Sequence, residues 1–442
     1  MTDRPIRIAL ISPRGPLYRH RIGSWRKSMR YMPLTLTTLA ALIPPEIEAE
    51  LTLVDEGIQD VDFDLDVDLV GISIITGSSA RGYEIADAYR KRGVPVVLGG
   101  PHPTLLPDEA AEHSDSVVVG YAEKTWPELL RDFAAGSMQS RYEPVLPYDL
   151  SGLPLPRRDL LPENRYATKY TIEATRGCAH NCEFCVVPTA WKGYYTRPVN
   201  EVVDEIRAMG SRRLLFLDLD MISDVEYSKE LFTALIPLKL QWGGLTTTKI
   251  VWDEELLDLI SRSGCRALLL GLESVERGSL IEMHKGFNTR EDPREVIRRL
   301  HERRIAIMGC FALGLDHDDK SVFERTAEMV IDTGIELPRF AIITPFPSTP
   351  LYKRFEAEGR ILTRDWTLYD AQHVVFQPAQ MTPEELLRGT EWTWKRVYGF
   401  GSIARRLSRT TTELGILTAA NLGYRFYAHN LHRYYTCGTS LV

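Results

Sequence analysis

The chain has 442 residues, of which 44% are hydrophobic and 26% are charged, a composition that excludes collagen-like, coiled-coil-only and wholly disordered proteins. The formal net charge is -7, which gives no electrostatic reason to expect nucleic acid as a partner, although a local basic patch would not show in this sum. The sequence has neither the apolar core of a secretory signal nor an apolar run near the ~20 residues of a membrane span. We therefore expect a cytoplasmic protein without a membrane span.

Short β-branched runs alternate with helical patterns in the first part of the chain. Strands are predicted at residues 6–12, 50–55, 67–75, 95–99 and 116–119, and helices at 33–43, 79–92 and 123–134. This alternation predicts a doubly wound, Rossmann-like α/β domain over residues 1–140. Such sheets bind ligands at the carboxyl ends of their strands, where Gly99 and Gly100 begin a turn.

Residues 141–168 contain several prolines and no sustained periodicity, which predicts an extended linker. A second alternation occupies residues 169–362, with strands predicted at about 170–174, 213–218, 242–248, 266–272, 305–313 and 339–344. Six such units predict a partial (β/α)6 TIM-type barrel, whose chemistry belongs at the carboxyl ends of the strands.

A small, mainly helical region is predicted over residues 363–442, with one helix beginning at the capping signature Thr382-Pro383-Glu384-Glu385. Its last part, residues 403–435, mixes arginines with aromatic residues. A nucleic-acid or membrane-surface helix is one interpretation of that mixture. We favour a solvated face backed by aromatic core contacts, and we assign it no chemistry.

Three of the six cysteines, Cys178, Cys182 and Cys185, lie in one short loop directly after a predicted strand, whereas Cys265, Cys310 and Cys437 are isolated. Tight cysteine spacing in a large cytosolic chain favours a metal or cluster site over disulfides. Three thiolates can bind one face of an iron-sulfur cube and leave one iron free. Structural zinc is the alternative, and it requires a fourth ligand. His180 is the nearest candidate, but we expect it to point outward.

At these cysteines the sequence resembles the radical SAM superfamily, whose CxxxCxxC loop follows the first barrel strand. The resemblance implies that the free iron of a [4Fe-4S] cluster binds S-adenosylmethionine and that reductive cleavage yields a 5'-deoxyadenosyl radical. It also implies an external electron donor, such as flavodoxin or ferredoxin. Phe184, just before the third cysteine, matches the aromatic residue that the family places against the adenine.

The same resemblance implies further S-adenosylmethionine contacts at the ends of successive barrel strands. They are Asp218 or Asp220 after the second strand, Glu273 and Ser274 after the fourth, Gly309, Leu313 and Gly314 at the fifth, and Thr344 and Pro345 after the sixth. The two aspartates stand where many members have Gly-Gly-Glu, and an aspartate that caps a helix is the alternative interpretation. For the glycines and prolines, the alternative is an ordinary loop.

The first domain resembles the cobalamin-binding domain that is fused to one class of radical SAM enzymes. The contacts implied are Leu34, Ser73, Thr76, Gly77, Gly99, Gly100, His102, Pro103, Thr104, Gly120 and Glu123. The chain departs from the family at Tyr121 and Ala122, where most members read Gly-Glu-Gly-Glu. His20 stands where cobalamin domains with the motif Asp-x-His-x-x-Gly have their cobalt-binding histidine. In this chain Tyr18 replaces the aspartate that would orient that histidine. We therefore expect cobalamin without a histidine ligand, and we expect His102 to shape its loop.

Together the two resemblances imply methyl transfer to an unactivated carbon of a small-molecule, natural-product or lipid substrate. Several relatives use the same cofactors for rearrangement, ring closure or oxidation, so these reactions remain alternatives. The segment with Tyr369 and His373 resembles the C-terminal region of hopanoid-type C-methylases, and these residues either reach the substrate or seal the barrel.

Two other interpretations are less favoured. Cys185-Val186-Val187-Pro188 with Arg197 and Glu205 also resembles methylthiotransferases, but those carry a second cluster on N-terminal cysteines, and no cysteine precedes Cys178 here. A non-catalytic cobalamin sensor would not need an open iron site, and hence would not need three clustered cysteines.

Overall fold

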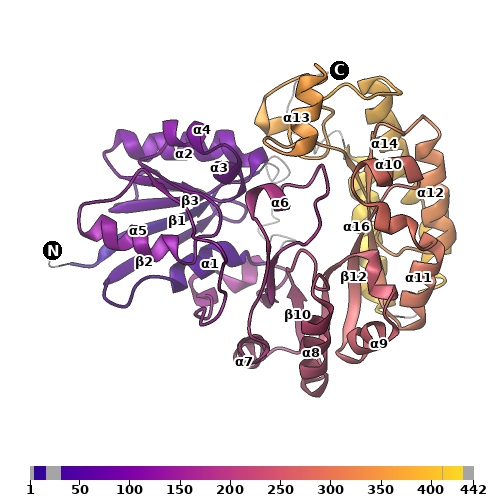
Figure 1. The fold of residues 1–442 in the computed structure, drawn as a ribbon, viewed down its shortest axis with the longest axis horizontal. Helices are drawn as coiled ribbons and strands as arrows, with labels where there is room; N and C mark the ends of the chain where they lie inside the picture. The colour runs from indigo at the N-terminus through magenta and orange to yellow at the C-terminus, as the bar shows by residue number, and fades with distance from the viewer. Residues whose placement is uncertain (1–3, 16–30, 411, 432–442) are drawn as a thin grey trace. The chain divides into compact units, whose positions relative to one another are not determined.

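The computed structural model in Figure 1 describes residues 4–15, 31–410 and 412–431. The described chain forms two compact units. The first comprises the residues up to Thr171 together with Thr189–Tyr195 and Asp365–Asp370, and the second comprises Ile172–Pro188, Thr196–Arg364 and the residues from Ala371 onward. Two short segments of the later chain therefore fold with the first unit.

The first unit contains a six-stranded sheet in the order β2-β1-β3-β4-β5-β6, in which every neighbouring pair is parallel. Its elements are β1 (Ile6–Ser12), α1 (Leu34–Ala41), β2 (Ala49–Asp55), β3 (Leu69–Ser73), η2 (Thr76–Ser78), α2 (Ser79–Lys91), β4 (Val96–Gly99), α3 (Pro101–Leu105), α4 (Pro107–Glu112), β5 (Ser116–Val118), α5 (Thr125–Ala134), β6 (Arg141–Tyr142), η3 (Arg158–Leu160), η4 (Glu163–Arg165) and η8 (Trp366–Leu368).

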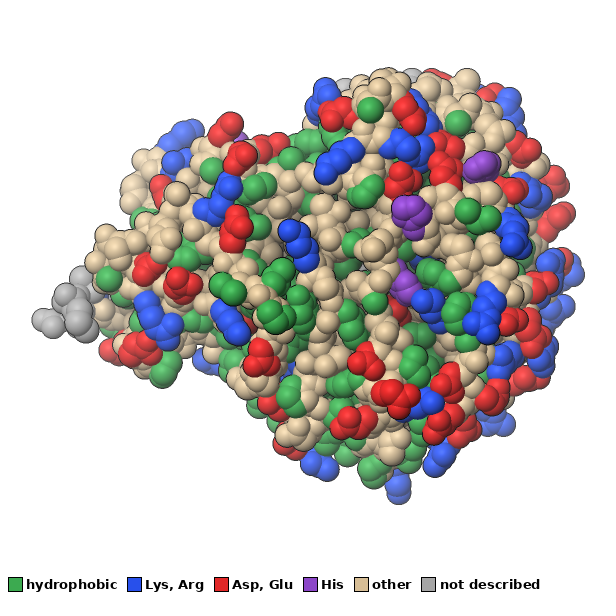
Figure 2. Space-filling view, in the orientation of Figure 1, with side chains coloured by type: hydrophobic (Ala, Val, Ile, Leu, Met, Phe, Trp, Pro, Cys, Tyr) green, Lys and Arg blue, Asp and Glu red, His purple; other side chains and the backbone are tan. Residues whose placement is uncertain are grey.

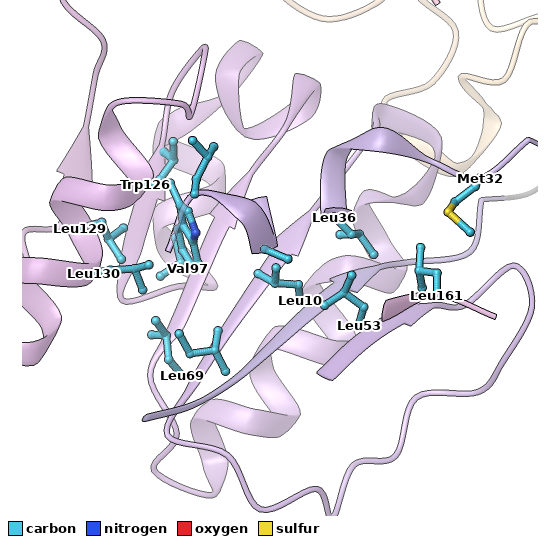
Figure 3. Close-up of a cluster of buried hydrophobic side chains, with 14 of the residues drawn as sticks. Leu10, Met32, Leu36, Leu53, Leu69, Val97, Trp126, Leu129, Leu130 and Leu161 are labelled. Carbon is cyan, nitrogen blue, oxygen red and sulfur yellow. The ribbon is translucent and has the colours of Figure 1, made fainter. Parts of the chain in front are cut away.

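This sheet is buried on both faces, as parallel sheets in α/β proteins are. Successive residues of β1 point to opposite faces, so Ile8 and Leu10 join one apolar cluster while Ala9 and Ile11 join another. The first cluster, drawn in Figure 3, includes residues of α1 and α5, and the second includes residues of α2. Helices therefore cover both faces, which confirms the predicted doubly wound fold.

The segment predicted as an extended linker, residues 141–168, instead adds to the first unit. It begins with β6, which pairs with β5 so that Tyr142 lies opposite Val118. Farther along, Tyr166 is buried, and its hydroxyl donates a hydrogen bond to Asp55 at 3.0 Å. A strand of two residues is too short to produce an alternating pattern, so the sequence does not reveal it.

The second unit contains the six strands predicted for the barrel, in the order β14-β13-β12-β11-β10-β7. The strands are β7 (Thr171–Ile172), β10 (Arg213–Phe216), β11 (Gln241–Thr246), β12 (Cys265–Glu273), β13 (Ala306–Leu313) and β14 (Arg339–Ile342). Neighbours from β10 to β14 are parallel, so their carboxyl ends meet at one edge. This arrangement confirms the partial barrel.

Helices connect the barrel strands and follow the outer side of their sheet (Figure 1). They are α7 (Val199–Met209), α8 (Val225–Leu235), α9 (Glu254–Arg262), α10 (Arg277–Glu282), α11 (Pro293–Glu302) and α12 (Val322–Thr333), with the short turns η5 (Ile236–Leu238), η6 (Thr248–Val251) and η7 (Gly286–Thr289). Helix α13 (Pro350–Ala357) follows the last strand. The remaining short elements are β8 (Thr175–Gly177), α6 (Val187–Ala190) and β9 (Tyr194–Thr196).

Three helices complete the second unit, namely α14 (Pro383–Val397), α15 (Phe400–Leu407) and α16 (Leu414–His429). The predicted start of α14 is confirmed, because the Thr382 hydroxyl accepts a hydrogen bond from the Glu385 N–H and the Glu385 carboxylate accepts one from the Thr382 N–H. None of the described helices combines the length and apolarity of a membrane span. On the face drawn in Figure 2, positive and negative side chains are interspersed.

Arg406 of α15 joins these helices to the barrel. Its side chain is fully buried, and its guanidinium donates to the backbone oxygens of Ile335, Glu336 and Val397 and to the side-chain oxygen of Asn421, at 2.7–3.2 Å. A guanidinium has donors enough to satisfy several carbonyl groups at once. One arginine of the basic C-terminal stretch is therefore part of the core rather than of a charged surface.

We predict that Arg406→Leu lowers the free energy of unfolding by about 3 kcal/mol or more, because it leaves several buried acceptors without a donor. The neighbouring Arg405 is exposed and pairs with Asp332 at 2.9 Å. Arg405→Leu should therefore cost under about 1 kcal/mol. Urea unfolding followed by circular dichroism measures both variants, and equal losses would contradict the assignment of Arg406 to the core.

Candidate functional site

The three clustered cysteines lie between β8 and α6, with Cys182 buried and Cys178 and Cys185 partly exposed. Burial raises the pKa of the Cys182 thiol to about 12. The thiolate therefore needs a positive charge beside it, which the iron of a cluster supplies. Among the described residues, no three His, Cys, Asp or Glu side chains converge as the ligands of a single metal ion would. In a cubane, each cysteine binds its own iron, so this donor set fits a cluster.

Neighbouring elements hold the backbone of the cysteine loop from outside. The Glu183 N–H donates to the carbonyl of Met283 at 3.2 Å, and the Glu183 carbonyl accepts the N–H of Leu351 at 3.1 Å. The ring of His284 lies 3.1 Å from the carbonyl of Asn181, where its Nδ1 can donate. The loop is thus fixed by residues that follow α10 and by the first turn of α13.

His180 does not point outward, and the prediction that it would is wrong. Its ring stacks on Phe287 of η7, with centroids 4.6 Å apart, and its side chain is 13% exposed. Its Nε2 lies 3.4 Å from the carboxylate of Asp220. The aromatic partner comes from a part of the chain about a hundred residues away, so the local sequence could not show it.

Asp218 and Asp220, the predicted contacts for the amino group of S-adenosylmethionine, are both buried. The Asp218 carboxylate accepts hydrogen bonds from the Thr175 N–H at 2.6 Å, from the Thr175 hydroxyl at 2.7 Å and from the Ala174 N–H at 3.1 Å. Burial raises its pKa to about 7. Asp220 accepts a hydrogen bond from the Ser223 hydroxyl at 2.8 Å. Asp218 therefore braces the backbone that enters the cysteine loop, and contact with the cofactor stays a prediction for both residues.

Lys285 is a residue of the site that the sequence analysis missed. Its ammonium lies 2.5 Å from the Glu273 carboxylate, and both side chains are nearly buried. Burial opposes the charge on Lys285, but Glu273 and the Cys182 thiol raise its pKa above the usual value. Glu273 itself has a φ of 65°, which is unusual for a residue other than glycine. Nothing in the local pattern distinguishes Lys285 from a surface lysine.

A small cavity adjoins the cysteine loop. Its lining is apolar at Phe184, Met283, Leu315, Ile343, Leu351 and Phe355 and charged at Glu183, Glu282, Asp316 and Arg354. Leu315 directly follows Gly314, and Ile343 directly precedes Thr344, so the cavity brings the predicted contacts of the fifth and sixth strands close to Phe184. Contact of Phe184 and of these strand ends with S-adenosylmethionine stays a prediction.

Other predicted contacts of the barrel have partners inside the protein. The Asp318 carboxylate accepts the N–H groups of Gly314 and Leu315 at 3.0 and 3.1 Å and so fixes their turn. At Gly309, an added Cβ would lie 3.2 Å from side chains of Leu272 and Ile335, so this glycine serves strand packing. The other predicted contacts of these strands are buried as well, namely Ser274, Leu313, Thr344 and Pro345.

In the first unit, the loops that follow β4 and β5 are tied together at one edge of the sheet. The Thr104 hydroxyl donates to the Gly100 carbonyl at 2.8 Å and accepts the Gly120 N–H at 2.9 Å. Gly100 has a φ of 97°, and an added Cβ would lie 2.9 Å from backbone atoms of Ile74. These glycines and the neighbouring Gly99 and Ser73 are partly exposed. These turns lie at the carboxyl ends of the strands, where doubly wound sheets bind ligands, and contact with cobalamin stays a prediction for them.

His102 is fully buried within this unit, and its Nε2 lies 3.1 Å from Glu109, which also accepts the indole N–H of Trp366 at 3.1 Å. These contacts support a role in shaping its loop. Other predicted cobalamin contacts are buried as well, namely Leu34, Thr76, Gly77, Pro103 and Glu123. His20 and Tyr18 lie outside the described residues.

The departure from the family at Tyr121 has a packing reason. The rings of Tyr121 and Tyr148 lie 4.8 Å apart, and the Tyr148 hydroxyl donates to the Glu123 carboxylate at 3.0 Å. Tyr369, in the segment that folds with the first unit, is also buried, and its ring packs on Trp366 at 4.8 Å. His373 is partly exposed.

Comparisons with known proteins agree with this geometry. A family model described as the Radical SAM superfamily matches residues 172–330, and one described as the B12 binding domain matches residues 47–130. The chain is also 32% identical over 390 residues to bacteriochlorophyllide d C-12(1)-methyltransferase of Chlorobaculum tepidum, covering 85% of this chain and 84% of that protein. The chain belongs to the radical SAM superfamily. It is one of the members that carry a B12 binding domain.

Two further proteins are similar over most of the chain. Bacteriochlorophyllide d C-8(2)-methyltransferase of the same bacterium is 30% identical over 406 residues, covering 82% of this chain and 86% of that protein. The radical S-adenosylmethionine methyltransferase TsrM of Kitasatospora setae, solved with cobalamin and a [4Fe-4S] cluster bound, is 17% identical with a TM-score of 0.65, covering 98% of both chains. The latter likeness shows a shared fold.

The protein is thus a radical SAM enzyme whose cofactors are a [4Fe-4S] cluster, S-adenosylmethionine and cobalamin. In the barrel unit, Cys178, Cys182 and Cys185 would hold the cluster. The edge formed by the loops after β3, β4 and β5 would hold cobalamin.

We predict that Lys285→Met destabilises the fold by about 3–5 kcal/mol, because it leaves the Glu273 carboxylate buried without its partner. Lys249→Met is the matched control. The Lys249 and Lys285 ammonium groups both lie over the Phe287 ring, at 4.9 and 6.0 Å, but the ion pair with Glu273 is made by Lys285. Combining Lys285→Met with Glu273→Leu should recover part of the loss. Thermal unfolding would contradict the account if the two lysine variants behaved alike.

Proposed function

We propose that this enzyme is a cobalamin-dependent radical C-methyltransferase that acts on an unactivated carbon of a small molecule. The observation that carries the proposal is the loop with three cysteines beside a small cavity whose lining includes Phe184, Leu315 and Ile343. Similarity to two methyltransferases over more than four fifths of the chain supports methyl transfer as the reaction. Natural products and lipids are the substrate classes that we expect.

When bound, S-adenosylmethionine supplies a methyl group and a 5'-deoxyadenosyl radical, and cobalamin carries the methyl group. The residues of the chain orient and shield this chemistry. The loop holds the three thiols at the carboxyl edge of the barrel sheet, and Phe184 offers an apolar surface for the adenine. Glu273 offers a carboxylate whose direction Lys285 fixes.

The reaction also requires an electron, because reductive cleavage of S-adenosylmethionine consumes one. We propose that a small external electron carrier, such as flavodoxin or ferredoxin, supplies it to the cluster. Cys178 and Cys185 are partly exposed, which gives a reductant a short path to the cluster that they would hold.

The test uses anaerobically purified, reconstituted protein with hydroxocobalamin, a reductant and S-adenosylmethionine. We expect bound corrin by absorbance and both 5'-deoxyadenosine and S-adenosylhomocysteine by chromatography. Bound corrin and 5'-deoxyadenosine without S-adenosylhomocysteine would contradict methyl transfer and favour a non-methylating reaction.

We predict that Cys182→Ala abolishes 5'-deoxyadenosine production, because two thiolates do not hold the cluster in place. Cys265→Ala is the matched control: Cys265 is also buried, but it lies at the start of β12, outside the loop. The control should retain production. Unchanged production by folded Cys182→Ala would contradict the cluster assignment.

A further inference from the structure

Glu183 is the one acidic side chain between the first and third cysteines, and it is firmly held. The guanidinium of Arg354, on α13, donates from Nε to one Glu183 oxygen at 2.8 Å and from Nη2 to the other at 3.0 Å. The Glu183 side chain is only 12% exposed. Two parallel hydrogen bonds between a planar guanidinium and a carboxylate fix both distance and orientation.

The same helix also binds the backbone of Glu183. Leu351 lies in the first turn of α13, where N–H groups have no partner within the helix, and its N–H donates to the Glu183 carbonyl at 3.1 Å. Helix α13 therefore binds the Glu183 carbonyl through Leu351 and, one turn later, the Glu183 carboxylate through Arg354. Because Phe184 is the next residue along the loop, the fixed position of Glu183 also restricts where Phe184 lies.

Further acidic groups hold Arg354 itself in place. Its Nη1 lies 2.6 Å from the Asp316 carboxylate, and its Nη2 lies 2.9 Å from Glu282. Arg360 donates to both oxygens of Asp316, at 2.6 and 3.0 Å, and the structure shows no contact of Arg360 with Glu183. Because the Arg354 guanidinium also pairs with these carboxylates, it cannot follow a movement of the loop without losing hydrogen bonds.

We propose that Arg354 is a positioning residue of the cluster loop, which it fixes through Glu183 so that the cluster thiols and Phe184 keep their places beside the cavity. Arg354, Glu183 and Phe184 all line that cavity, so the ion pair of Arg354 with Glu183 lies directly beside Phe184. This inference extends beyond the proposed reaction, since it depends on the cluster and S-adenosylmethionine and not on which group is transferred.

The experiment compares Arg354→Gln, Glu183→Gln and the double variant in anaerobically reconstituted protein. Low-temperature electron paramagnetic resonance of the reduced cluster is recorded over a titration with S-adenosylmethionine. We expect an altered spectrum and roughly 10-fold weaker binding in each single variant, the size typical of lost partners around a metal site. Because the pair of Glu183 with Arg354 is broken in all three cases, the double variant should lose no more affinity for S-adenosylmethionine than Arg354→Gln alone.

Arg360→Gln is the matched control, because it removes an arginine from the same acidic group without touching the loop. It should keep the wild-type spectrum and affinity even where it lowers the unfolding temperature. Should Arg354→Gln fail to fold, Arg354→Lys takes its place, since lysine keeps the charge but not the paired hydrogen bonds. A wild-type spectrum and affinity in the Arg354 variant would overturn the proposal. An equally altered spectrum and equally weakened binding in Arg360→Gln would overturn it too.

Discussion

The site depends on one constraint: three thiols on a single irregular loop must keep fixed places, although the loop has no regular hydrogen-bond ladder of its own. The chain meets this constraint by holding the loop from elements that lie far along the sequence. Asp218 braces the backbone that enters the loop, and Met283 and Leu351 bind the backbone at Glu183. The carboxyl ends of parallel strands bring these partners to one edge, which is why the fold suits the chemistry.

Paired buried charges carry much of this support. Lys285 with Glu273, and Arg354 with Glu183, lie largely out of water, where an unpaired charge is costly. Such pairs contribute geometry more dependably than net stability, because each partner has few alternative positions. The cobalamin-binding unit uses neutral groups for the same purpose at its own edge, where Thr104 ties two glycine-rich turns together.

The sequence predicted the two sheets and most of their strands, because runs of buried apolar residues mark parallel strands directly. It also predicted the cysteine loop, whose spacing is a local property. It missed Lys285 and Arg354 and misplaced His180, since each of these side chains meets its partner across a long sequence separation. It likewise missed β6, which is too short to form a pattern, and the return of Asp365–Asp370 to the first unit, which leaves no periodic signal.

The most direct test of the central claim is to measure iron and sulfide in the reconstituted wild-type chain and to record the electron paramagnetic resonance of its reduced form with and without S-adenosylmethionine. The account predicts about four irons and four sulfides per chain and a spectrum that changes when S-adenosylmethionine binds the iron left free by the three cysteines. Zinc in place of iron, or a cluster whose spectrum ignores S-adenosylmethionine, would contradict it.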